Sequence, residues 1–156
     1  VDTQFSVDGN YWVWAQGELA SDGEEFSSAN KIDITGGTSA WPTPPNLNDQ
    51  RTGSSGTSAI ELSKTKLIAG KMVMLDIKMT RTDGTTPQLE PYLGAFAHII
   101  TTPADGDVLI HVHPVGTGPS QGMIHATFPS AGQYRLWIQF IDNGSLKTIP
   151  LSVEVF

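Results

Sequence analysis

The residues with the clearest chemical potential are the histidines, which gather in one short stretch of the chain. All four lie between positions 98 and 125, as His98, His111, His113 and His125. Imidazole is a common ligand for zinc and Cu(II). Met123 adds a thioether two residues before His125, and thioethers favour Cu(I). The sequence therefore predicts a metal site, with copper as the first choice and zinc as the alternative.

Other metal chemistries fit this stretch poorly. The chain has no cysteine, which removes thiolate sites and thiol nucleophiles. The predicted strands around the histidines contain no carboxylate, so calcium and structural zinc are disfavoured. A single His-x-His pair in a strand is more often incidental than a ligand. The prediction therefore depends on whether the fold brings several histidines together.

A predicted β-hairpin brings the first histidines together. Residues Tyr92–Thr101 and Val108–His113 read as two strands joined by a loop at 103–106. Counting outward from a four-residue loop places His98 directly opposite His111. Opposed side chains in an antiparallel pair have Cβ atoms about 5 Å apart, which is within reach of one metal ion.

The remaining candidates follow from the alternation of side chains along strands. His113 lies two residues beyond His111 and therefore on the same face. In the next strand Ile124 takes an inward position, so Met123 and His125 face away from the core. One allowed register would place His125 beside His111 and Met123 beside His113.

The elements that hold these side chains are predicted to be strands throughout. Period-two alternation punctuated by Gly, Pro, Asn and Asp dominates, and no apolar period of 3.6 persists for three turns. The chain of 156 residues is long enough for one domain with a substantial core. We therefore expect an all-β, immunoglobulin-like β-sandwich with an N-terminal extension that contains at least one strand.

The C-terminal hairpin is the best-defined element. Asn143-Gly144 is typical of a type I′ turn, which would place Asp142 opposite Ser145 and align the apolar residues of both strands on one face. Pro150 cannot donate to a ladder, so we expect this last strand at an edge. The segment before Tyr134 is typical of the tyrosine corner of immunoglobulin-like sandwiches.

The chain divides into two predicted parts. Residues 58–156 form the sandwich, and residues 1–57 form the extension. In the extension we expect a strand at 11–19, a Pro-rich connector at 41–45 and a Gly/Ser-rich linker at 51–58.

Residues of the predicted sandwich resemble a known group of secreted bacterial domains. The resemblance spans about residues 60–156 and rests on Leu89–Ala95, His98, His111–Pro114 and Phe128–Leu136. These segments are similar to the YtkA-like and copper-resistance-type immunoglobulin folds. The resemblance implies an extracytoplasmic sandwich associated with a heavy metal, copper above all, and no established catalytic activity. His98, His111 and His113 match the histidine pattern of that group.

Composition narrows the class of partner. The net charge is −7 and no Lys/Arg cluster occurs, which argues against nucleic acid and anionic lipid. No apolar stretch approaches the length of a membrane span. A chain that opens at Val1 and lacks cysteine suits the mature form of a periplasmic or secreted protein.

Three functions follow from these observations. The first is a non-enzymatic, copper-binding protein. The alternative is a structural subunit of an extracellular fibre or matrix, in which Tyr11–Leu19 is lent to a neighbouring subunit and metal bridges the homo-oligomer. A three-histidine enzyme is disfavoured, because no general base lies at a predictable distance.

Overall fold

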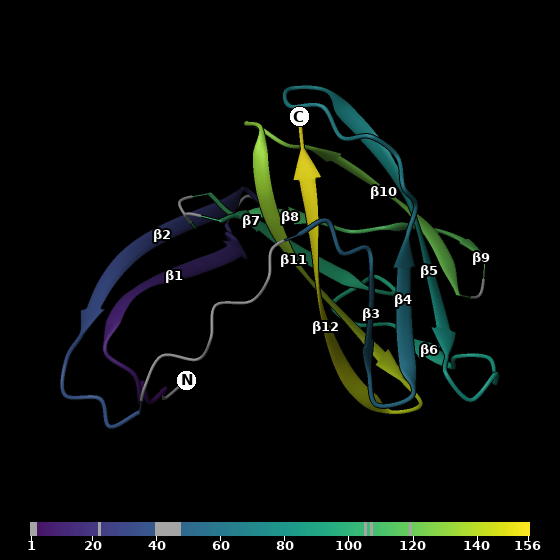
Figure 1. The fold of residues 1–156 in the computed structure, drawn as a ribbon, viewed down its shortest axis with the longest axis horizontal. Helices are drawn as coiled ribbons and strands as arrows, with labels where there is room; N and C mark the ends of the chain where they lie inside the picture. The colour runs from purple at the N-terminus through teal and green to yellow at the C-terminus, as the bar shows by residue number, and fades with distance from the viewer. Residues whose placement is uncertain (1–2, 22, 40–47, 105, 107, 119) are drawn as a thin grey trace. The chain divides into compact units, whose positions relative to one another are not determined.

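The structure is a computed structural model that describes residues 3–21, 23–39, 48–104, 106, 108–118 and 120–156. Its regular elements in these residues are all β-strands, so the all-β prediction is confirmed (Figure 1). No helix long and apolar enough to span a membrane occurs in the described residues. The chain forms two compact units, one of Val1–Asn46 with Gly106–Leu109, and one of Leu47–Asp105 with Ile110–Phe156.

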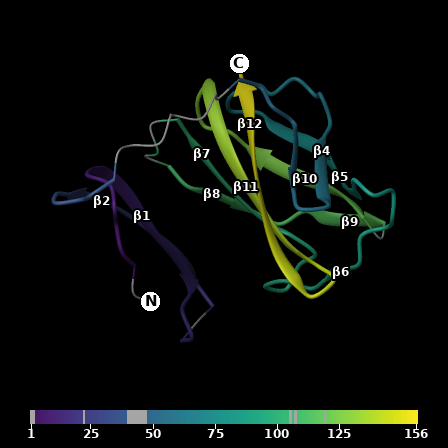
Figure 2. The same ribbon diagram turned by 60° about the horizontal axis from the view of Figure 1, so that its bottom comes forward.

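The larger unit is an immunoglobulin-like β-sandwich of two antiparallel sheets (Figure 2). One sheet has the strand order β3-β4-β5-β10-β9. The other has the order β12-β11-β7-β8, with β6 also paired to β11. The strands of the first sheet are β3 (Thr52–Ser55), β4 (Ser58–Leu62), β5 (Met72–Arg81), β9 (Val115–Gly118) and β10 (Gln121–Thr127). Those of the second are β6 (Leu89–Glu90), β7 (His98–Pro103), β8 (Ile110–Val112), β11 (Gly132–Asp142) and β12 (Ser145–Val155).

The core lies between these two sheets because every long strand alternates apolar and polar residues. In β5 each second residue is buried from Val73 to Met79. The inward residues of β10 and β11 are buried in the same alternating way. The core is completed by large side chains that are almost fully inaccessible, among them Phe128, Tyr134 and Phe140. One face of each sheet is therefore fixed in the core, and the other face is free to hold polar groups.

The C-terminal hairpin has the predicted register. Asp142 pairs with Ser145, and Ile138 pairs with Ile149 on the inward face. The turn residues Asn143 and Gly144 have φ angles of 52° and 71°, which a type I′ turn requires. A two-residue turn sets the register of both strands, so the pattern of apolar residues could be aligned from the sequence alone.

A tyrosine corner closes the start of β11, as predicted. The Tyr134 hydroxyl donates to the backbone carbonyl of Ser130 at 3.0 Å, and the tyrosine side chain is fully buried. Its ring also packs edge-on against Phe128. This bond fixes the path of the chain as it enters the strand.

Strand β12 lies at a sheet edge, in agreement with the position of Pro150. Two isolated bridges cover part of this edge, one between Gln50 and Ser152 and one between Leu67 and Val155. Segments outside the named strands thus satisfy backbone groups that an open edge would expose.

The smaller unit contains a two-stranded antiparallel ribbon of β1 (Gly9–Glu18) and β2 (Glu25–Ile34), so the extension contains the expected strand. The predicted linker at 51–58 instead contains β3, which forms a hairpin with β4 in the sandwich. Gly56 lies in the turn between these strands with a φ of 60°, a conformation that favours glycine. The predicted connector at 41–45 lies outside the described residues.

Candidate metal centre

The candidate metal centre lies on the outer face of the sheet that contains β7 and β8. In β7 the core takes Ile99, so the flanking His98 points outward. In β8 the partly buried Ile110 and Val112 pack against the core, which turns His111 to the same outer face. His113 follows the strand and is exposed. The alternation of two short strands thus positions all three imidazoles.

The pairing of β7 with β8 differs from the predicted register by two residues. Ile99 pairs with Val112 and Ile100 pairs with His111, so His98 is not directly opposite His111 as predicted. The reason is the connection. Strand β8 begins only at Ile110, so the loop is longer than the four residues that we assumed. A shift of two residues preserves the face of every side chain, so the three histidines still meet.

The predicted register for His125 and Met123 is wrong. Strand β10 pairs with β5 and β9 in the other sheet, and it does not pair with β8. His125 pairs with Met74, and Met123 pairs with Asp76. Both residues face away from the core, as predicted, but from the opposite side of the sandwich. The strand pattern gives the face of a side chain, whereas it does not determine which sheet the strand joins.

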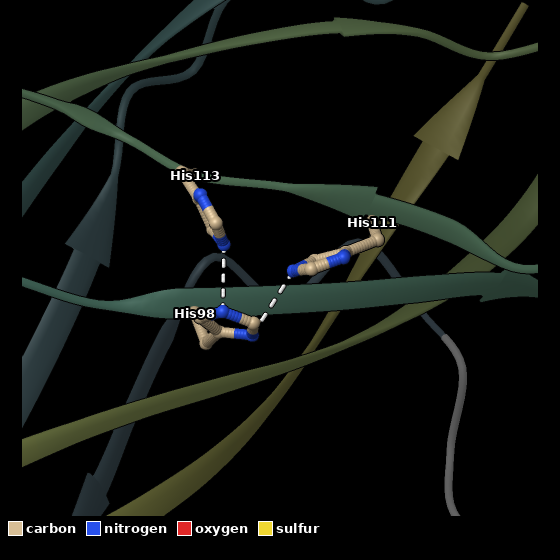
Figure 3. A group of neighbouring side chains, drawn as sticks. All are labelled: His98, His111 and His113. Atoms are coloured by element: carbon tan, nitrogen blue, oxygen red, sulfur yellow. Dashed lines mark hydrogen bonds between the residues drawn. The ribbon is translucent and has the colours of Figure 1, made fainter. Parts of the chain in front are cut away.

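The three imidazoles are in mutual contact (Figure 3). His111 Nε2 lies 3.0 Å from His98 Nδ1, and His113 Nε2 lies 2.6 Å from His98 Nε2. One ligand nitrogen from each residue can be chosen so that all three lie within 4.8 Å of one another. His98 is thus the central member of the group and contacts its neighbours through both ring nitrogens.

The environment keeps the central imidazole neutral. Partial burial lowers the pKa of His98 from 6.5 to about 4, with further lowering from the charges that His111 and His113 would bear. A neutral imidazole has a free lone pair, which a metal ion needs. At neutral pH, His98 is therefore in the protonation state of a ligand.

A residue that the sequence reasoning did not select, Tyr92, packs against this group. Its ring lies edge-on to His98 with 5.9 Å between ring centroids. Tyr92 and Ala95 form a bridge across a tight turn of Leu93 and Gly94, whose φ angles are 51° and 83°. We had expected a continuous strand from Tyr92 to Thr101, which this turn interrupts. Gly94, which follows Leu93, is the residue in the sequence that could have indicated this turn.

The donor set fits a metal ion of intermediate softness. Two nitrogens bound to one tetrahedral zinc at about 2.0–2.1 Å lie about 3.3 Å apart. One nitrogen from each imidazole lies within 4.8 Å of the other two, so a small movement of the rings would bring the three onto one ion. The group contains no carboxylate among the described residues, so its ligands are nitrogen only. Three protein ligands leave a further coordination position open. The geometry therefore provides a histidine triad that could hold a metal ion.

Comparisons with known proteins match the part of the chain that contains the histidine triad. A family model described as "Domain of unknown function (DUF8832)" matches residues 53–156. No curated protein matches the chain. Among solved structures, the chain is similar to one titled "Crystal structure of the Lin-41 filamin domain", with 15% sequence identity and a TM-score of 0.46. That match covers 67% of this chain and 97% of the filamin domain.

Proposed function

The chain belongs to the DUF8832 family, and we propose that it is a non-enzymatic metal-binding protein that holds copper through His98, His111 and His113. The observation that supports this function is the approach of three ligand nitrogens to within 4.8 Å of one another. Three imidazoles, two of them half-buried and one exposed, meet here without a carboxylate and have no evident structural role. Apolar side chains would stabilise the same outer face at lower cost.

Copper is our choice of metal because of the donor set. Imidazole ligands suit Cu(II), and at equal geometry Cu(II) binds nitrogen sites more tightly than the other divalent first-row metals. Zinc is the alternative, since three histidines and an open position also suit that ion. The protein would act outside the cytoplasm, either periplasmic or secreted, as its resemblance to secreted bacterial domains implies.

Titration of the metal-free protein with Cu(II) and Zn(II) tests this function. We expect one Cu(II) per chain, bound by nitrogen ligands that are visible in the electron paramagnetic resonance spectrum. Loss of an outer-shell partner alone costs about 10- to 100-fold in metal affinity, so His111→Ala should weaken binding by at least that factor.

The matched control is His125→Ala, because His125 lies on the other sheet and faces away from the triad. This variant should bind Cu(II) like the wild type. An unchanged affinity and spectrum in His111→Ala would overturn the proposed function. Equal losses in both variants would do the same.

A second candidate is a structural subunit of an extracellular assembly. The observation in its favour is the β1–β2 ribbon, in which every side chain whose exposure the structure describes is at least partly exposed. Val13 and Phe26 are each 44% exposed. An isolated two-stranded hairpin is marginally stable in water, so a neighbouring subunit could stabilise it.

This second function requires that β1 leaves its partner β2 or that the ribbon adds to a neighbour's sheet edge. Light scattering and electron microscopy of the full chain, with and without Cu(II), would test it. We expect concentration-dependent polymers if the ribbon assembles. A monomer that persists at high concentration under both conditions excludes this role and leaves the metal-binding function intact.

A further inference from the structure

Methionine and histidine side chains share the outer face of the sheet opposite the histidine triad. Strand β5 contributes Met72 and Met74, and strand β10 contributes Met123 and His125. The residues between them are buried in the core, which turns all four side chains outward. This face belongs to the sheet that contains neither β7 nor β8.

The register of β5 and β10 brings these side chains together. His125 pairs directly with Met74. Met72 is two residues from Met74, so it lies diagonally across from His125. Met123 lies diagonally across from Met74 in the same way. Directly opposed Cβ atoms are about 5 Å apart and diagonal ones about 7–8 Å, and a methionine side chain with three rotatable bonds spans that distance.

The exposure of the methionines is a feature that packing does not explain. Met72 is 72% exposed and Met74 is 57% exposed, while the fourth methionine of the chain, Met79, is 1% exposed in the core. An outward-facing methionine leaves apolar surface in water and is not stabilised by burial in the core. Soft thioether sulfur is, however, a ligand that selects Cu(I).

We propose that Met74, His125 and the neighbouring thioether of Met72 or Met123 form a second metal site, selective for a soft monovalent ion such as Cu(I). The site takes the imidazole nitrogen of His125, the thioether of Met74 and one of the two flanking thioethers, since Met72 and Met123 lie roughly 13 Å apart along the strands and cannot reach the same ion. Asp76, which pairs with Met123, is a hard ligand that Cu(I) does not favour. The site is independent of the histidine triad, since it uses none of the same residues and lies on the other sheet.

Nuclear magnetic resonance of the methionine methyl groups tests this site directly. The full chain would be titrated with Cu(I) under anaerobic conditions, and with Ag(I) as a soft, redox-inert probe. We expect the methyl signals of Met72, Met74 and Met123 to shift as the site is saturated. The signal of buried Met79 serves as the internal control and should stay in place.

Two variants separate the sites. Met74→Leu keeps an apolar side chain of similar size, so the fold should be kept, and we expect Cu(I) affinity to fall by about tenfold or more. The same variant should bind Cu(II) at the triad like the wild type, whereas His111→Ala should keep the methyl shifts of Met72 and Met74.

Methyl signals that do not move with Cu(I) or Ag(I) would overturn the second site, as would an unchanged Cu(I) affinity in Met74→Leu. Either result leaves the histidine triad untested by this experiment, because the triad is read separately from its Cu(II) spectrum. Conversely, loss of Cu(II) binding with intact methyl shifts would reject the triad alone.

Discussion

At the scale of single residues, the central fact is the neutral imidazole of His98. Its pKa is about 4 in the folded chain and 6.5 in the unfolded one, because burial and the nearby imidazoles disfavour its charged form. Between these two pH values the unfolded chain binds a proton that the folded chain does not. Protonation therefore favours unfolding in this window.

We predict that the free energy of unfolding of the metal-free protein falls as the pH is lowered from about 6.5 to about 4. The stability is fully present above this window. Urea denaturation at a series of pH values, with a chelator present, measures the slope. His98→Gln should flatten it, whereas His125→Gln, at an exposed position, should leave it unchanged. An identical slope in His98→Gln and the wild type would contradict the prediction.

Tyr92 belongs to the same scale, since its ring shields one side of His98. We predict that Tyr92→Ala opens His98 to water and raises its pKa toward 6.5. Tyr92→Phe retains the ring and should keep the pKa low. Titration of the imidazole proton signals by nuclear magnetic resonance compares the two variants. Equal pKa values for His98 in both would show that the ring contact has no effect.

At the scale of elements, the C-terminal hairpin could be predicted residue by residue, and the hairpin of the metal centre could not. The Asn143-Gly144 turn fixes a register because only two residues lie between the strands. The connection before Ile110 has no such constraint, and the strands slipped by two residues from the expected pairing. The histidines nevertheless met, because alternation determines faces independently of register.

The partner of β10 could not be predicted for a different reason. Alternation along this strand correctly indicated that His125 faces away from the core. It gave no information on whether the outer face belongs to one sheet or the other, which depends on contacts between residues far apart in the sequence. For this reason His125 and Met123 were predicted beside the triad, whereas they lie on the other sheet of the sandwich.

The tyrosine corner yields a prediction at this scale. Tyr134→Phe removes the hydroxyl that donates to Ser130 while keeping the buried ring. We expect the free energy of unfolding to fall by about 0.5–1.5 kcal/mol, the net value of one intramolecular hydrogen bond. Urea unfolding measures the change, and Tyr92→Phe, outside the core, is the matched control. No loss relative to that control would mean that the corner does not stabilise the entry into β11.

At the scale of the whole molecule, a buried carboxylate joins the two sheets. Asp142 at the end of β11 accepts a hydrogen bond at 2.7 Å from the Ser58 hydroxyl of β4, which lies in the other sheet. Its second oxygen accepts the backbone N–H of Gln88 at 3.0 Å. Asp142 is only 3% exposed, and these donors, with the Arg81 guanidinium 3.9 Å from the same carboxyl group, offset the cost of burying a polar side chain.

We predict that Asp142→Ala lowers the free energy of unfolding by about 2 kcal/mol or more, because the buried Ser58 hydroxyl and the Gln88 N–H lose their acceptor. Glu61→Ala, at an exposed position of β4, is the control and should change stability by less than about 0.5 kcal/mol. Chemical denaturation of both variants provides the comparison. Similar stabilities would show that the bond between the sheets contributes little.

The contacts of His98 also determine how fast a metal can enter. Its two ring nitrogens bond to different neighbours, so at least one of these bonds must break before a single nitrogen can face an ion together with His111 and His113. We expect the observed rate of Cu(II) uptake in stopped-flow experiments to rise with metal concentration and then level off at the rate of this ring rearrangement. A rate that stays linear in concentration would mean that the triad is already arranged for capture.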